Sequence, residues 1–156
     1  MTKRNRDILK KAKQALKDAK FDFPLLVLLG MIKQEAPRQN GQLSNTGDGL
    51  MQVTLDSGNR GGQYGNTNRG IMNNLIDGIK TLQGFARGST SLAMTVSRYN
   101  GGNAEKMGDQ KYTQNVAARI NSGEVGRNFG KEFSPEKLSE EDKKIVKALD
   151  DYKRPK

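Results

Sequence analysis

The residue best placed to do chemistry in this sequence is Glu35, the acid at the end of the most apolar stretch. That stretch, residues 24–36, reads Pro-Leu-Leu-Val-Leu-Leu-Gly-Met-Ile-Lys-Gln-Glu-Ala. A carboxyl group at the C-terminal end of a buried helix meets low dielectric and the negative end of the helix dipole, so we expect its pKa to be raised. A carboxylic acid that keeps its proton near neutral pH can serve as a general acid. The alternative is that Glu35 only marks the solvent end of an amphipathic helix.

Local signals predict a helix that carries Glu35. Asp22 is a candidate N-cap, and Pro24 suits a first helical turn, where its missing N–H costs nothing. Pro37 should end the helix, because a proline disfavours the α conformation of the residue before it. Leucines on every face predict that this helix is buried all round.

Composition limits the chemistry available to the rest of the chain. The sequence of 156 residues contains neither histidine nor cysteine, which removes His-dependent and thiol catalysis, disulfides and nearly all structural zinc sites. The formal charge is 27 − 17 = +10, which favours polyanionic partners such as nucleic acid, an anionic membrane or acidic cell-wall polymers. No apolar run approaches the roughly 20 residues of a membrane span, and the basic N-terminus lacks the hydrophobic core of a signal peptide.

Hydrophobic periodicity predicts a mainly α protein with little or no β structure and a single domain over residues 1–156. Helices are expected at residues 5–20, 24–36, 69–87, 89–99, 110–121 and 135–152, with Ser89 or Thr90 capping the fourth of these. Residues 37–48, 56–68 and 122–133 are expected to form loops. The helix at 5–20 is either a basic helix for a polyanion or membrane, or a packing helix with a solvated face.

Three further segments place polar groups in glycine-containing turns or on helices, and with Glu35 they form a pattern. In order they are Gly49-Leu50-Met51-Gln52, Asn74-Leu-Ile-Asp-Gly78 and Arg98-Tyr99-Asn100-Gly101, with Ser44 in the loop after Glu35. This order and spacing resemble the soluble lytic transglycosylase family, which is related to goose-type lysozymes. The likeness covers about residues 24–120, so the helices at 5–20 and 135–152 are accessory to it. It departs from the family at Ala36, where a serine is usual, and at Arg98, where an alanine is usual.

The resemblance implies a lysozyme-like fold with a glycan-binding groove, and an enzyme that cleaves peptidoglycan glycan strands. Glu35 would be the catalytic general acid and base, acting between N-acetylmuramic acid and N-acetylglucosamine to leave 1,6-anhydromuramyl products. Tyr99 would hydrogen-bond and orient Glu35. Ser44, Gln52 and Asn100 would bind the substrate, and Met51 would either bind it or pack. Asn74 and Gly78 would be structural.

A second carboxylate would indicate hydrolysis instead. Asp48 is the candidate nearest in sequence to Gly49-Leu50-Met51-Gln52, which we call the Met51 turn. An aspartate before a glycine is, however, also typical of a turn. Goose-type lysozymes carry an aspartate directly after Gly-Leu-Met-Gln-Val, and this sequence has Thr54 there.

The alternatives are therefore a hydrolytic goose-type muramidase, a non-catalytic basic binder of wall polymer or nucleic acid, and a wall-degrading domain that has become structural. The sequence predicts neither a cofactor nor a metal site, and no nucleic-acid partner is expected, since recognisable aromatic platforms are missing. We expect a monomer that acts on the bacterial cell wall, in the periplasm or outside the cell. Delivery by a phage, or trimming of a secreted enzyme, would explain why the chain shows no signal peptide.

Overall fold

The computed structural model describes residues 1–35, 50–51, 68–100 and 109–155, and these residues form a mainly α fold, as predicted. No strand occurs within those ranges. The helices are α1 (Lys3–Asp18), α2 (Leu25–Glu35), α3 (Asn68–Arg87), α4 (Leu92–Tyr99), α5 (Gln110–Asn121), α6 (Glu124–Phe129) and α7 (Glu140–Asp151). Two short 3-10 turns, η1 (Lys131–Phe133) and η2 (Pro135–Lys137), connect α6 to α7.

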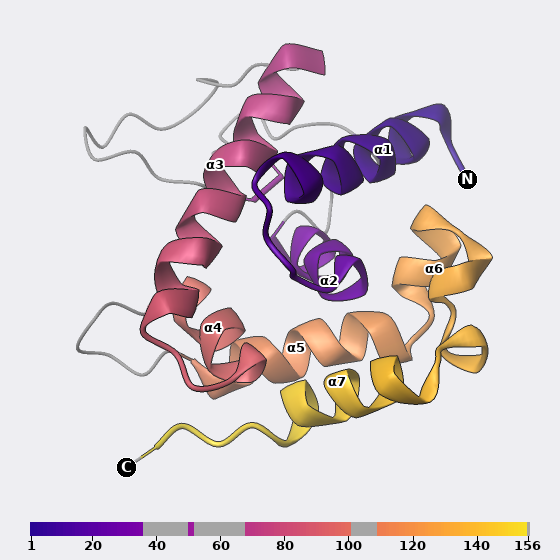
Figure 1. Cartoon of the computed structure of the whole chain (residues 1–156). Coiled ribbons are helices and arrows are strands. Elements are labelled where there is room, and N and C mark those ends of the chain that lie inside the picture. The colour runs from indigo at the N-terminus through magenta and orange to yellow at the C-terminus, as the bar shows by residue number, and fades with distance from the viewer. Residues whose placement is uncertain (36–49, 52–67, 101–108, 156) are drawn as a thin grey trace.

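Helix α2 lies at the centre, with the other helices around it (Figure 1). Every residue from Leu26 to Lys33 is buried, which confirms the prediction that this helix is covered on all sides. The Pro24 carbonyl opens the helix by accepting the N–H groups of Val27 and Leu28, both at 3.1 Å. Asp22 lies three residues before Leu25, the first residue of α2, so it is too early in the chain to be the N-cap predicted for it.

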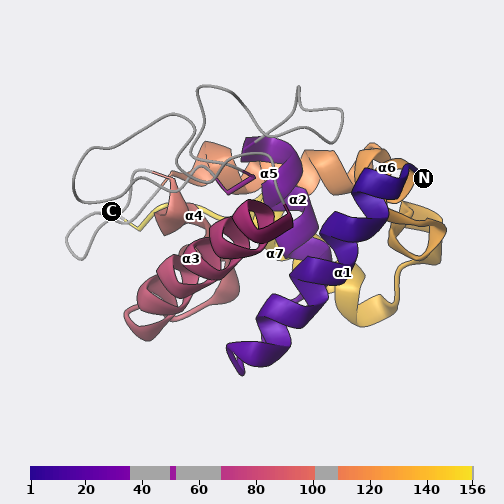
Figure 2. The same ribbon diagram turned by 90° about the horizontal axis from the view of Figure 1, so that it is seen from above.

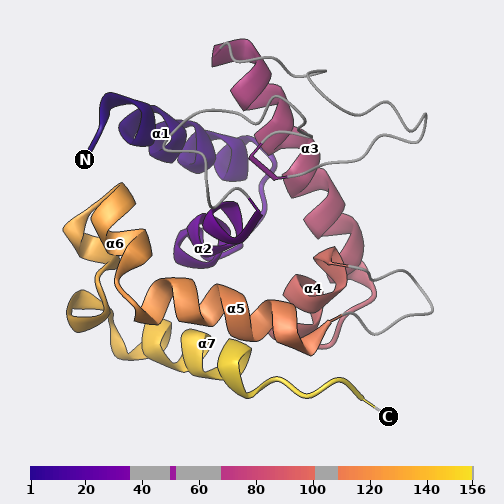
Figure 3. The same ribbon diagram turned by 180° about the vertical axis from the view of Figure 1, so that it is seen from behind.

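Helix α5 approaches α2 closely because α2 has a glycine at the contact. A Cβ atom added to Gly30 would lie 3.1 Å from Cγ1 of Val116 and 3.3 Å from the Ile120 side chain. On its other side α5 runs along α7, as Figures 1 and 3 both show. The backbone N–H of Arg154, beyond α7, donates to Oε1 of Gln110 at the start of α5.

Helix α1 is amphipathic, as its sequence predicts, and packs on α2, α3 and α6. Thr2 caps it by accepting the N–H of Asn5 at 3.1 Å, so the helix starts two residues before the predicted boundary. Lys20, with φ of 51°, then turns the chain toward α2.

Helix α3 ends at Arg87, directly before Gly88, as predicted. The cap of α4 is not Ser89 or Thr90 but Ser91, whose hydroxyl accepts the N–H of Met94 at 3.1 Å. Ser89 instead donates to the Phe85 carbonyl at 2.8 Å, so its side chain closes α3 and is not free to start α4.

The prediction of a loop over residues 122–133 was wrong, because α6 and η1 lie there. Gly123 takes φ of 84°, which ends α5 and lets α6 begin at once. Val125 and Phe129 of α6 are buried one turn apart. A helix this short gives too few repeats for its periodicity to stand out.

The last predicted helix, 135–152, also needs correction at its start. Residues 135–137 form η2, and Leu138 is extended. Ser139 then caps α7 by accepting the N–H of Asp142 at 3.1 Å. None of the helices that the structure describes is long and apolar enough to cross a membrane.

Candidate active site

Glu35 is the last residue of α2, and its carboxyl group is half-buried. Its Oε1 atom accepts a hydrogen bond of 2.8 Å from the hydroxyl of Tyr112 on α5. Burial raises the pKa of Glu35 above its ordinary value of 4.5, and the hydrogen bond from Tyr112 partly opposes that rise. The raised pKa agrees with the sequence-based expectation and suits a group that must give up a proton.

Tyr112 is a site residue that no motif in the sequence indicates. Its spacing from Val116 and Ile120 is typical of a core position, and only 4% of the residue is exposed. A buried tyrosine usually finds a partner for its hydroxyl, and this was the signal available in the sequence. Burial first, and then the neighbouring Glu35, raise the pKa of Tyr112 well above 10.0, so the phenol remains a hydrogen-bond donor.

The peptide groups of Met51 are held from two helices. The N–H of Met51 donates to Oδ1 of Asn74 on α3 at 2.8 Å, and the carbonyl accepts a hydrogen bond from the hydroxyl of Tyr99 on α4. Asn74 is fully buried, which confirms its predicted structural role. This Met51 turn is therefore attached to the helices that follow it in the chain.

Gly78 allows the Met51 turn to lie against α3. A Cβ atom at position 78 would lie 2.7 Å from both Cβ and Cγ of Met51, closer than real contacts allow. Gly78 is thus a close-packing point, as predicted. Met51 itself is fully buried, so of its two expected roles the structure favours packing over substrate contact.

Tyr99 does not take the role predicted for it. Its hydroxyl proton goes to the Met51 carbonyl, and the hydrogen bond on Glu35 comes from Tyr112. The two tyrosines are near enough to interact electrostatically, so Tyr99 lies close to the pair of Glu35 and Tyr112 while its hydroxyl supports the Met51 turn.

The remaining predicted residues are distributed as follows. Asn100 is exposed at the C-terminus of α4, and its Nδ2 atom donates to Oδ2 of Asp109 at 3.2 Å. Arg98, where the family pattern has alanine, is buried, and its guanidinium donates to the Gly88 carbonyl and the Ser89 hydroxyl. Arg98 therefore stabilises the connection between α3 and α4. Ser44, Asp48 and Gln52 lie outside the described residues.

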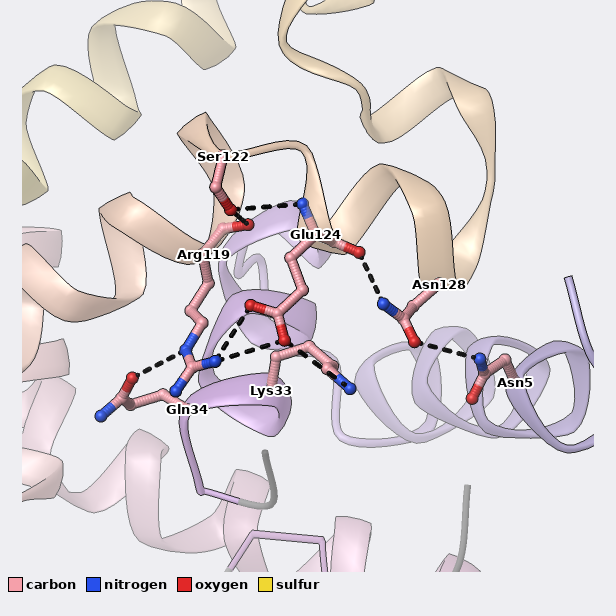
Figure 4. A network of polar contacts seen from close by, with 7 residues as sticks. All are labelled: Asn5, Lys33, Gln34, Arg119, Ser122, Glu124 and Asn128. Carbon is pink, nitrogen blue, oxygen red and sulfur yellow. Dashed lines mark hydrogen bonds and ion pairs between the residues drawn. The ribbon is translucent and has the colours of Figure 1, made fainter. Parts of the chain in front are cut away.

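The last turn of α2 is further held by a set of polar contacts that we call the Glu124 network (Figure 4). The Glu124 carboxylate accepts from Nη1 of Arg119 at 3.0 and 3.2 Å, and lies 3.9 Å from Nζ of Lys33. Nε of Arg119 donates to Oε1 of Gln34 at 3.0 Å. With Tyr112 on Glu35, contacts from α5 and α6 therefore reach Lys33, Gln34 and Glu35 in turn.

The network continues to the N-terminal helix. Nδ2 of Asn128 donates to the Glu124 carbonyl at 2.8 Å, and Nδ2 of Asn5 donates to Oδ1 of Asn128 at 3.4 Å (Figure 4). Helices α1, α2, α5 and α6 are thereby connected next to Glu35.

Among the described residues, no group of His, Cys, Asp and Glu side chains is arranged to hold a metal ion. Comparisons of the chain with family models, curated proteins and solved structures found no match.

Proposed function

We propose that this chain cleaves the β-1,4 bond between N-acetylmuramic acid and N-acetylglucosamine in bacterial peptidoglycan, with Glu35 as general acid and then general base. The observation that supports this most is the environment of Glu35: a half-buried carboxyl group with a raised pKa, at the end of a core helix and hydrogen-bonded by Tyr112. The order of motifs that resembles lytic transglycosylases supports the same assignment.

In the first step, Glu35 donates its proton to the glycosidic oxygen as the bond to the muramyl anomeric carbon breaks. The positive charge that develops at that carbon is relieved by the neighbouring acetamido group of the sugar. Glu35 is left as a carboxylate, and the hydrogen bond from Tyr112 stabilises this charged form.

In the second step, the Glu35 carboxylate removes the proton of the muramyl 6-hydroxyl group, whose oxygen attacks the anomeric carbon. The product is a 1,6-anhydro sugar, and Glu35 regains its proton without consuming water. Because the attacking hydroxyl already belongs to the sugar, the step avoids the entropy cost of bringing in a second molecule. Ser44, Gln52 and Asn100 are proposed to contact the sugars.

The alternative product is a reducing end, formed if a water molecule attacks as in goose-type lysozymes. Hydrolytic glycosidases commonly use two carboxylates. Thr54 at the position of the second carboxylate favours the anhydro product. Mass spectrometry of muropeptides released from purified walls distinguishes the two products.

The decisive variant is Glu35→Gln, with Glu136→Gln as the control for the same chemical change at an exposed position. Glutamine can still accept the Tyr112 hydrogen bond but cannot transfer a proton, so we expect a loss of about 10²–10⁴-fold in the rate of wall cleavage. Circular dichroism should show an unaltered helical fold. An E35Q protein as active as the control would rule out the assignment.

A further inference from the structure

The exposed side of α1 carries a regular row of cations that the proposed catalysis does not use. We call Lys3, Arg6, Lys10, Lys13 and Lys17 the basic stripe; all are exposed. They are separated by alternating steps of three and four residues, the repeat of one helix face. At 100° per residue they fall within an arc of about 80°, and no other residue of α1 lies in that arc.

The five cations of the basic stripe outnumber the two acids of α1, Asp7 and Asp18, which lie beside the stripe. Within the described part of the chain, none of its members forms an ion pair, and the first turn of α1 contains no acid. Like charges three and four residues apart repel each other, and cations near a helix N-terminus oppose the dipole. Helix α7 differs, because Lys143 pairs with Glu140 and Lys147 with Asp151.

The opposite side of α1 shows that the stripe is not half of a membrane-inserting helix. Ile8, Leu9, Ala12, Ala15 and Leu16 are buried in the protein core. An interfacial helix must place its apolar side into the lipid, and that side of α1 is already occupied. A partner must therefore bind through the cations alone.

We propose that the basic stripe binds a linear phosphodiester polymer attached to the cell wall, of the polyol-phosphate kind. The stripe is one charge wide and about 21 Å long from Lys3 to Lys17, with a cation every ~5 Å. A phosphodiester chain repeats its charge on the same scale, as a DNA strand does at about 3.4 Å. This inference rests on the proposed function, since such polymers are carried by the glycan that Glu35 would cleave.

The composition of the stripe favours a polyol phosphate over nucleic acid. Four of its members are lysines, which act as point charges and do not recognise base edges in the bidentate manner of arginine. The stripe has no aromatic side chain on which a base could stack.

The location of the stripe also suits a wall partner. It starts beside Asn5, which the Glu124 network connects to Gln34, the neighbour of the catalytic acid. A polymer bound along α1 would hold the protein at the wall on which it is proposed to act.

The test compares the full-length parent with two triple variants of equal charge. The stripe variant is Lys10→Gln, Lys13→Gln and Lys17→Gln. The control variant changes Lys131, Lys144 and Lys153, exposed residues dispersed over the C-terminal part, to Gln. Binding to poly(glycerol phosphate) and to a single-stranded oligonucleotide of equal charge is measured over a salt series.

We expect the stripe variant to bind poly(glycerol phosphate) about tenfold more weakly than the control. The slope of log K against log salt should become shallower by about 2, from three lost contacts at roughly 0.7 each. Equal losses in both variants would show that only net charge matters and would overturn the proposal. Tighter binding of the oligonucleotide through the same lysines would also overturn it, in favour of a nucleic-acid partner.

Cleavage assays separate this inference from the proposed function. Walls are prepared with their phosphate polymers and after chemical removal of them. The parent should cleave intact walls faster than stripped walls, and the stripe variant should lose that preference while the control keeps it. If the parent cleaves neither kind of wall, the proposed function fails, whereas the binding result is decided independently. If all three proteins show the same preference, the inference fails and the proposed function stands.

Discussion

The hydroxyl of Tyr112 has two effects on Glu35 that can be separated experimentally. It fixes the position of one carboxylate oxygen, and it favours the ionised form, which opposes the pKa rise caused by burial. The first effect concerns the rate at the optimal pH. The second concerns the pH at which the acid loses its proton.

Tyr112→Phe removes the hydroxyl and keeps the buried ring. We expect the maximal rate of wall cleavage to fall by about 10–100-fold, because the carboxyl group is no longer held in position. The pKa of Glu35 should rise further, so the limb of the rate profile that falls with increasing pH should move to higher pH. A pH series of initial rates measures both effects.

Tyr99→Phe is the matched control. This variant loses the hydrogen bond to the Met51 carbonyl, and Tyr99 is not a cause of the Glu35 pKa shift. A lower rate without displacement of the high-pH limb is expected. The assignment of the two tyrosines would be reversed if the limb moved in Y99F and stayed in Y112F.

At the scale of elements, the contact between α3 and the Met51 turn depends on Gly78. In Gly78→Ala the new methyl group would meet the Met51 side chain at 2.7 Å, and the backbone there is fixed by Asn74 and Tyr99. We expect a loss of about 1–3 kcal/mol in the free energy of unfolding, despite the better helix propensity of alanine. Denaturant titration measures this change.

Gly84 provides the comparison within the same helix. An added Cβ at position 84 has nothing within 4 Å, so Gly84→Ala should raise the free energy of unfolding by about 0.5–1 kcal/mol. Changes of opposite sign in the free energy of unfolding for the two variants would show that the loss at Gly78 comes from its contact with Met51. Stabilisation by both substitutions would contradict the described packing.

The end of α2 is held to α5 and α6 by the Glu124 network. Glu124→Gln removes the charge that Arg119 and Lys33 share, in a site where the side chains of Glu124 and Arg119 are only 22% and 28% exposed. We expect a destabilisation of about 1–3 kcal/mol together with a lower cleavage rate, since Gln34 and Glu35 are positioned by the same helices. Thermal unfolding and initial rates test this.

The control for that experiment is Asp151→Asn, which breaks the ion pair with Lys147. Those two side chains are 58% and 77% exposed, so solvent screens the pair and no measurable change in the free energy of unfolding is expected. If E124Q also left the free energy of unfolding unchanged, the Glu124 network would not contribute to stability, and apolar packing alone would hold α2.

At the scale of the whole molecule, the pKa of Glu35 makes stability depend on pH. Because the folded pKa is raised above 4.5, the folded protein binds more protons than the unfolded chain between 4.5 and that folded pKa. The contribution of Glu35 to stability is therefore complete below pH 4.5 and is lost as pH rises through the folded pKa.

Glu35→Gln removes this dependence, so E35Q should be more stable than the parent at neutral pH. The difference should shrink as pH falls and vanish below about 4.5. Free energies of unfolding measured for both proteins across this range provide the test. A difference that stays constant with pH would show that the Glu35 carboxyl group is not disfavoured by burial.

The helices could be predicted from sequence where one face repeats several times. The stripe Ile8, Leu9, Ala12, Ala15 and Leu16 predicts α1, and the all-apolar run predicts a buried α2. Helix α6 could not be predicted, because two buried residues one turn apart do not define a period. Predicted helix boundaries were wrong where several residues could form the same cap. Ser89, for example, closes α3 and leaves Ser91 to cap α4.

The site was predictable only in part, for a different reason. The position of Glu35 at the end of α2 follows from local sequence, and so does its burial. Its partner Tyr112 is 77 residues away and is selected by how α5 lies on α2, which depends on Gly30 and the packing around it. The order of motifs does not determine whether Tyr99 or Tyr112 contacts Glu35, because that depends on the tertiary packing of the helices.

The packing of α7 along α5 bears on how short a fragment can be and still keep the contact between Glu35 and Tyr112. Tyr112 lies on α5, and the outer side of α5 is covered by α7 and by the Arg154–Gln110 hydrogen bond. A fragment of residues 24–120, the part covered by the sequence resemblance, would expose that side of α5. The helix that carries Tyr112 would then lose its packing against α7. Helix α7 thus supports the helix that positions Tyr112, and a fragment that keeps the pair of Glu35 and Tyr112 should extend through residue 154.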